Sequence, residues 1–310
     1  MPGSLIGTAV RRVEDPDLVR GLGTYVDDLR IEGLLHLAFV RSPVAHGVLS
    51  GVDATAARRA PGVVAVYTAA DLATPRHHSF IVLNDACKRP PLAEDKVRFV
   101  GEAVAVVVAE SRRAAADAVE LVDMDIEPLP AVTDPEQAFG DGAPLQFDEL
   151  GTNLAAGARE ADGFDPLDGA EVVVRARMEN QRVAVVPLEG NAITVQPGSG
   201  DGEHELTIHV STQMPHLLRD LAATLFELDL QRVRVVAPAV GGGFGGKAGI
   251  APEHAVAIGA ARALGRPVSW VESRSENLVA MPHGRAQVQY VELGVRRDGR
   301  IVGFARPGGR

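Results

Sequence analysis

The densest glycine cluster of this 310-residue chain constrains its fold more than any other feature. Residues 241–247 read G-G-G-F-G-G-K, after an apolar run over 233–240 and before a helical pattern over 252–264. Five glycines in six residues cost unfolded-state entropy, about 0.5–1 kcal/mol each, which a simple turn rarely justifies. Glycine lets a backbone approach a ligand closely, and the positive end of a following helix favours an anion. The cluster therefore predicts an anion-binding loop, most simply one for a phosphate-bearing ligand.

Two nucleotide-binding motifs are matched in part by this loop. Gly241, Gly243 and Gly246 fit G-x-G-x-x-G, and Glu272 ends the next predicted strand, as in an NAD-dependent dehydrogenase. However, no series of strand–helix units follows to complete a doubly wound sheet. The loop also approaches the phosphate-loop motif of nucleotide triphosphatases, but Ala248 stands where that motif needs a hydroxyl for magnesium. A tightly packed turn without a ligand is the third alternative, so the loop alone leaves its ligand open.

Composition restricts the class of protein. Hydrophobic residues make up 46% and the net charge is -10, which fits a globular chain of about two domains and argues against a nucleic-acid partner. The single cysteine, Cys87, excludes an internal disulfide and an all-cysteine metal site, and we expect a buried structural thiol. The histidines show no metal-ligand spacing. No apolar stretch could span a membrane and no signal peptide is recognisable, so we expect a cytoplasmic protein.

Hydrophobic periodicity predicts alternating strands and helices, with Ser111 and Ser273 as helix N-caps and Gly265 as a C-cap. A stretch rich in proline, glycine and acid over 128–144 suits a surface connection. The predicted helices cover residues 53–60, 111–122, 215–228 and 252–264. The predicted strands cover residues 34–40, 63–67, 103–109, 172–178, 193–196, 206–210, 232–237, 268–271 and 287–295. The 193–196 and 206–210 strands are expected to form a hairpin, and 287–295 an edge or hairpin strand.

Further segments resemble one known family in order and spacing. They read G-L-G-T-Y-V-D-D at 21–28, R-S-P-V-A-H at 41–46, V-R-F-V-G-E at 97–102, S-T-Q-M-P-H at 211–216, V-G-G-G-F-G-G-K at 240–247 and P-H-G-R at 282–285. Together they resemble the molybdenum hydroxylases, the family of xanthine dehydrogenase, aldehyde oxidase and aerobic carbon monoxide dehydrogenase. The resemblance implies an α+β fold. A hammerhead-like α+β domain would cover 1–135, a linker 136–168, and the start of a molybdopterin-binding α+β domain 169–310.

The resemblance also implies a site. In this family, molybdenum is held by the pterin dithiolene rather than by protein side chains. Gly242, Gly243, Phe244 and Gly245 would pack on the molybdopterin, and Gln213 would hydrogen-bond an oxo ligand of the molybdenum. The cofactor is expected in its cytosine dinucleotide form. FAD and iron–sulfur clusters are expected on partner proteins, a FAD-binding medium subunit and an iron–sulfur small subunit.

Two residues beside the loop refine this expectation. Lys247 could contact a phosphate or be a solvated loop charge, and the second is expected. Ala248 stands where the purine-oxidising branch carries a glutamate that faces substrate, which favours carbon monoxide or an aldehyde as substrate class. The predicted function is therefore that of a molybdopterin-binding subunit, or part of one, in an oxidoreductase that hydroxylates a small carbonyl or related substrate with water as the oxygen source.

The chain also departs from the family pattern. Family large subunits run well beyond this length and place there a substrate-facing loop and a C-terminal glutamate that acts as general base. Residues 304–310 depart from the expected strand, and 187–191 lacks the proline and arginine expected after the glutamate. Two hypotheses follow: a second chain supplies the C-terminal half, or this is a non-catalytic fragment. An NAD-dependent dehydrogenase stays as a minor alternative.

Overall fold

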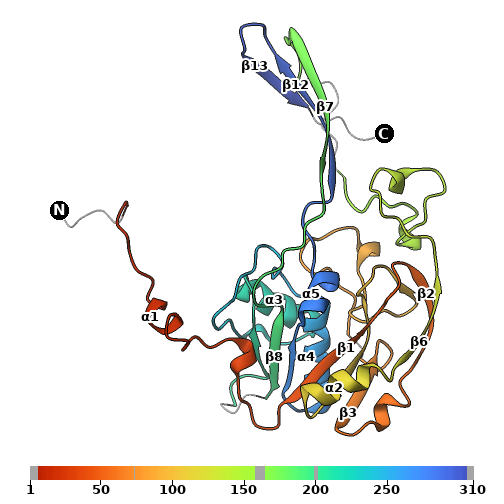
Figure 1. Ribbon diagram of the computed structural model, residues 1–310, viewed down its shortest axis with the longest axis vertical. Helices are drawn as coiled ribbons and strands as arrows, with labels where there is room; N and C mark the ends of the chain where they lie inside the picture. Colours follow the sequence, from red (N-terminus) through yellow and green to blue (C-terminus); the bar gives the residue numbers. More distant parts are fainter. Residues whose placement is uncertain (1–5, 73, 158–164, 199–201, 306–310) are drawn as a thin grey trace.

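The computed structural model describes residues 6–72, 74–157, 165–198 and 202–305. A mixed α/β body lies between an N-terminal arm and a small sheet that projects away from it (Figure 1). The body is built on a seven-stranded sheet of order β10-β9-β8-β11-β1-β5-β3. These strands are β1 (Leu35–Arg41), β3 (Val63–Thr68), β5 (Ala103–Ala109), β8 (Ala192–Pro197), β9 (Leu206–Val210), β10 (Val233–Val236) and β11 (Val268–Val271).

This large sheet joins strands from distant parts of the chain. β1 pairs in parallel with β11, with Leu35 opposite Val268 and His36 opposite Ser269. The first predicted domain, residues 1–135, and the third, residues 169–310, therefore contribute to one sheet and one core. Their boundaries stay predictions.

Three helices form where the apolar periodicity predicts them and pack against strands of this sheet: α2 (Arg112–Val119), α3 (Pro215–Leu225) and α4 (Pro252–Leu264). α5 (Arg274–Ala280) follows the predicted Ser273 cap, and the short α1 (Asp15–Leu18) lies in the N-terminal arm (Figure 1). α4 is buried on almost all sides and packs against β8 and β11, and it ends at Gly265, whose φ of 61° is left-handed. Ser111 caps α2 by accepting a hydrogen bond from the Ala114 N–H, and Ser273 caps α5 in the same way. These cap predictions are confirmed.

Short helical turns of the 3₁₀ type connect the main elements. They are η1 (Val26–Asp28), η2 (Ala57–Arg59), η3 (Asp85–Cys87), η4 (Gln137–Phe139), η5 (Asp148–Leu150) and η6 (Leu230–Arg232). Cys87, in η3, is 6% exposed, which confirms the buried thiol. None of the helices in the described ranges has the length and apolar character that a bilayer crossing would require.

The predicted helix over 53–60 is wrong. Asp53 instead ends β2 (Gly47–Asp53), and only the single turn η2 follows. The Asp53 carboxylate accepts a hydrogen bond from the Thr55 N–H, a local turn that competes with helix formation, and Pro61 leaves little room for propagation. β2 forms a second sheet with β4 (Lys96–Val97) and β6 (Asp123–Pro128).

A third sheet contains the last strands of the described chain. Its order is β13-β12-β7, with β13 (Ile301–Ala305), β12 (Gln287–Val295) and β7 (Val172–Asn180). The β8–β9 hairpin is confirmed. β12 does form a hairpin with β13, but it is the central strand of its sheet rather than an edge.

Candidate functional site

The glycine loop leaves β10 and reaches α4 through several left-handed turns. Gly242 has φ of 97°, Phe244 of 50° and Gly245 of 88°. Such values suit glycine, but Phe244 is held there at a cost in backbone strain, a feature common at functional sites. The Phe244 side chain is 74% exposed, so it is not an ordinary core aromatic.

Packing against the rest of the protein explains the other glycines. A Cβ atom on Gly241 would lie 2.5 Å from Cβ of Glu189, and one on Gly243 would lie 2.5 Å from Cγ of Gln213. A Cβ atom on Gly246 would meet Cγ2 of Val185 at 2.7 Å. The loop backbone is therefore pressed against its own protein at three of its five glycines.

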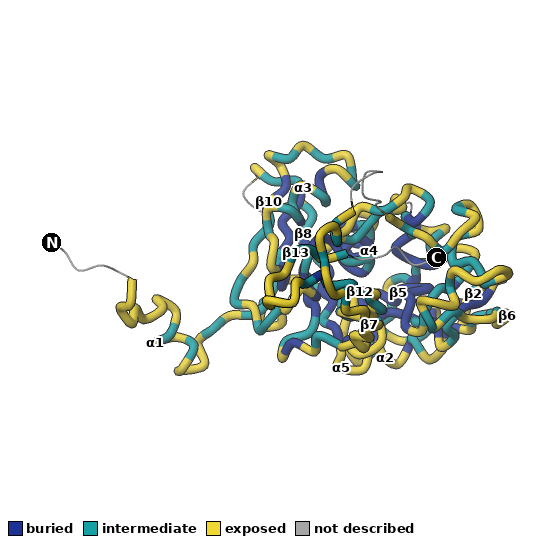
Figure 2. The backbone as a smooth tube through the Cα atoms, turned by 90° about the horizontal axis from the view of Figure 1, so that it is seen from above, coloured by how far each residue is buried: buried dark blue, intermediate teal, exposed yellow. Residues whose placement is uncertain are grey.

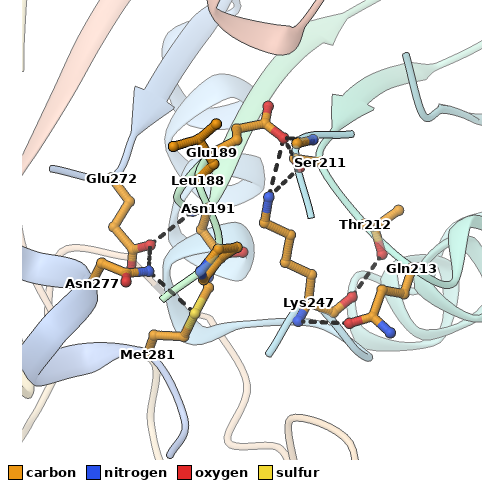
Figure 3. Close-up of polar contacts among 12 residues, drawn as sticks. Leu188, Glu189, Asn191, Ser211, Thr212, Gln213, Lys247, Glu272, Asn277 and Met281 are labelled. Carbon is orange, nitrogen blue, oxygen red and sulfur yellow. Dashed lines mark hydrogen bonds and ion pairs between the residues drawn. The ribbon is translucent and has the colours of Figure 1, made fainter. Parts of the chain in front are cut away.

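Gln213 is held against this loop in one orientation. Its Oε1 atom accepts hydrogen bonds from the N–H groups of Gly245, at 2.8 Å, and Lys247, at 3.3 Å. The Lys247 carbonyl accepts two further hydrogen bonds, from the Gln213 backbone N–H at 3.0 Å and from the Thr212 side-chain hydroxyl at 3.2 Å (Figure 3). Because the amide oxygen is engaged by two donors, the Nε2 group of this exposed side chain is directed away from the loop backbone.

Lys247 lies beneath the loop, with 0% of its side chain exposed. Its Nζ atom donates to the Ser211 hydroxyl at 2.7 Å and pairs with Oε2 of Glu189 at 3.1 Å. Burial lowers the pKa of Lys247, and the Glu189 carboxylate opposes that shift. The prediction of a solvated loop charge is wrong, because the Lys247 ammonium forms its ion pair with Glu189, from a distant segment, inside the protein.

Glu189 is the residue that the sequence analysis missed. Its Oε2 atom accepts hydrogen bonds from the Gly241 N–H and the Ser211 hydroxyl, each at 2.7 Å, as well as the Lys247 ion pair. The Glu189 N–H donates in return to the Gly241 carbonyl at 3.1 Å. The only sequence signal was a glutamate in the 187–191 segment, which departs from the family pattern.

Glu272 is engaged in a separate group of contacts. It is 7% exposed, and its Oε2 atom accepts from the Asn191 N–H at 2.8 Å and from Nδ2 of Asn277 at 2.7 Å (Figure 3). Burial raises the pKa of this carboxyl. It is therefore not displayed toward a ribose. In addition, β10 and β11 are separated by β9 and β8, whereas a dinucleotide-binding unit places them side by side. The NAD-dependent interpretation is wrong.

The loop keeps three consecutive backbone donors free. In the ranges that the structure describes, the N–H groups of Gly242, Gly243 and Phe244 have no hydrogen-bond acceptor within the protein. Alternating backbone conformations of this kind turn successive N–H groups toward a common anion. No group of three or more His, Cys, Asp or Glu side chains among the described residues could hold a metal ion. The arrangement suits a cofactor that carries its own metal ligands.

Comparison with known proteins decides the family. A family model described as the molybdopterin cofactor-binding domain matches residues 147–305. A second model, the a/b hammerhead domain of aldehyde oxidase and xanthine dehydrogenase, matches residues 20–130. The chain belongs to the molybdenum hydroxylase family. The predicted fold class, a hammerhead domain followed by a molybdopterin-binding domain, is confirmed.

Relatives of this family are similar along nearly the whole chain. The nicotine 6-hydroxylase large subunit of Paenarthrobacter nicotinovorans is 38% identical over 97% of the chain and 37% of the relative. The carbon monoxide dehydrogenase large chain of Hydrogenophaga pseudoflava is 38% identical over 94% of the chain and 38% of the relative. The crystal structure of quinoline 2-oxidoreductase from Pseudomonas putida 86 superposes with a TM-score of 0.86 at 35% identity, covering 97% of this chain and 38% of that one. The chain thus spans about two fifths of the length of these relatives.

Proposed function

We propose that this chain is the molybdopterin-binding part of the large subunit of an oxidoreductase of the carbon monoxide dehydrogenase and aldehyde oxidase type. It would hydroxylate a small carbonyl or related substrate with oxygen from water. The names of the similar proteins, a hydroxylase large subunit and a dehydrogenase large chain, support this proposal. A FAD-binding medium subunit and an iron–sulfur small subunit would be its electron-transfer partners, and the cofactor would be the cytosine dinucleotide form.

The observation that carries the proposal is that the loop's free backbone N–H groups and the Nε2 donor of Gln213 lie close together in the structure. The N–H groups of Gly242, Gly243 and Phe244 would receive the pterin and its anionic groups, and Gly245 would allow close approach. Because its oxygen is already bonded to the loop, Gln213 would present only Nε2 to the cofactor. A donor of this kind holds a ligand oxygen without displacing it from the metal.

When bound, the molybdenum cofactor would supply the two-electron oxidation. The protein contributes binding and orientation. The Lys247–Glu189 pair fixes the start of the loop through the Gly241 N–H, and Gln213 fixes its end through Gly245. Ala248 carries only a methyl group beside the loop, which favours a small substrate without a charged anchor. Turnover of xanthine in preference to carbon monoxide or an aldehyde by the assembled complex would contradict this substrate class.

Metal and pterin analysis tests the cofactor proposal directly. The chain, purified from a host that makes molybdopterin, should contain about one molybdenum per chain and release a fluorescent pterin on denaturation. Gln213→Glu keeps the acceptor for the two loop N–H groups and loses the Nε2 donor, so molybdenum content should fall at least tenfold with little change in thermal stability. Gln231→Glu makes the same change at an exposed residue of η6 and should retain the metal. Absence of molybdenum and pterin from the wild type would favour the non-catalytic fragment.

A further inference from the structure

The three-stranded sheet projects from the body with two chemically different faces. In Figure 1 it extends away from the large sheet, and in Figure 2 the tube through β7 is exposed along most of its length. Apart from one another, β7, β12 and β13 make no extensive contact with any helix or strand in the described ranges. A sheet of this size needs a packed face for its stability.

One face is apolar across all three strands. Residues directly opposite in an antiparallel pair point to the same side of the sheet. The β7–β12 register places three apolar pairs on this face: Val172 with Val295, Val174 with Leu293, and Ala176 with Val291. β13 adds Phe304, opposite Leu293. Val174 is 55% and Val172 39% exposed, and the β7 and β12 residues of this apolar face include no charged side chain.

The other face is charged and partly covered by the chain itself. Arg175 pairs with Glu292 at 2.6 Å, and Arg177 pairs with Glu136 of the connecting segment. Gly294 and Gly303 oppose each other on this face, where an added Cβ on Gly303 would lie 1.5 Å from the Pro166 carbonyl oxygen. The covering segment therefore packs on one side only, and the apolar side has no corresponding layer among the described residues.

We propose that the apolar face of this sheet docks the polypeptide that makes up the rest of the large subunit in the relatives. This inference rests on the proposed function, because it assumes that the chain works in such a subunit. The match to the carbon monoxide dehydrogenase large chain takes in 38% of that relative, so 62% (100 − 38) of its length lies outside the match. A face without charges suits an apolar protein layer, since contiguous exposed apolar surface marks a protein interface. A second copy of this chain bound to the apolar face would occupy the surface that the remaining part of such a large subunit would need.

Cysteine labelling tests the docking surface, since Cys87 is buried and gives little background. Val174→Cys places a thiol on the apolar face, and Val64→Cys places one in β3 of the body, where the residue is 38% exposed against 55% for Val174. Each variant is labelled with a maleimide, alone and after co-expression with the unmatched 62% of the Hydrogenophaga pseudoflava large chain. We expect co-purification, with labelling at 174 slowed at least tenfold and labelling at 64 unchanged.

Three results would overturn the proposal. They are equal labelling at 174 in a co-purifying complex, failure of the two polypeptides to co-purify, and protection at 174 in the chain alone with elution as a dimer. Molybdenum and pterin are measured on the same preparations. Bound cofactor without protection at 174 refutes the docking surface and leaves the proposed function standing. Protection without cofactor supports the docking surface and counts against the cofactor proposal.

Discussion

Replacing Lys247 with methionine removes a fully buried ammonium while keeping a flexible chain of similar length. Its side chain is 0% and that of Glu189 16% exposed, so the pair lies within the protein. Removing one partner of a buried ion pair typically costs about 3–5 kcal/mol, because the other charge stays buried without compensation. Glu189 keeps two donors, the Gly241 N–H and the Ser211 hydroxyl, so we expect the lower end, about 3 kcal/mol.

A double-mutant cycle separates the ion pair from simple loss of packing. Glu189→Gln alone leaves the Lys247 ammonium without its counter-charge and should also destabilise. In the double variant both charges are gone, and the glutamine oxygen can still accept from the Gly241 N–H. The double variant should therefore be more stable than the sum of the single changes predicts, by about 2 kcal/mol of coupling.

Urea unfolding followed by circular dichroism measures these effects as shifts of the midpoint at constant slope. Lys88→Met is the matched control, because Lys88 pairs with Asp85 at the surface and its loss should leave the midpoint essentially unchanged. Additive single changes, or a Lys247→Met midpoint equal to that of Lys88→Met, would refute the reasoning. Either result would mean that the ammonium finds water or another acceptor in solution.

Three further predictions concern the loop and the groups buried near it. Burial lowers the pKa of His254 to about 4, so between pH 6.5 and 4 the unfolded chain binds more protons than the folded chain, and the free energy of unfolding should fall by about 3 kcal/mol as pH falls through that window. His254→Gln, which can still accept from the Ala251 N–H, should lack this pH dependence in urea titrations. Burial raises the pKa of Glu272, so stability should fall as pH rises from 4.5 through the folded-state pKa, and Glu272→Gln should remove that loss; identical pH profiles would contradict it. Gly243→Ala forces its Cβ against Gln213 and should cost about 1–3 kcal/mol, whereas Gly51→Ala, with open space around it, should be neutral in the same assay.

Local signals predicted the elements whose structure is decided locally. The continuous apolar run of β5 is buried at all seven residues, and the β8–β9 hairpin and the Gly265 end of α4 follow from alternation and capping. Pairing between β1 and β11 could not be predicted, because more than 200 residues separate the two strands and neither sequence specifies its partner. β6 was missed, since its alternating D-M-D-I-E-P pattern lies directly before a stretch rich in proline and glycine.

The candidate site was predictable only in part for the same reason. The motifs named Gln213 and the loop, but the burial of Lys247 depends on Glu189, which lies 58 residues earlier in the chain. A lysine in a glycine-rich loop is usually solvated, and only the fold brings an acceptor beneath it. Gln213 was expected to serve the cofactor with its amide group, and the structure adds that the oxygen of that amide already serves the loop.

The number of glycines in the loop is weaker evidence for a ligand than it first suggests. Contacts with Glu189, Gln213 and Val185 already exclude side chains at Gly241, Gly243 and Gly246, and left-handed φ values favour glycine at Gly242 and Gly245. Every glycine thus has a reason within the protein itself. The argument for a ligand rests instead on three adjacent N–H groups, the last that of the strained and exposed Phe244, which have no acceptor among the described residues. A loop serving only to connect β10 and α4 would have no reason to retain that strain, whereas a cofactor-binding loop would.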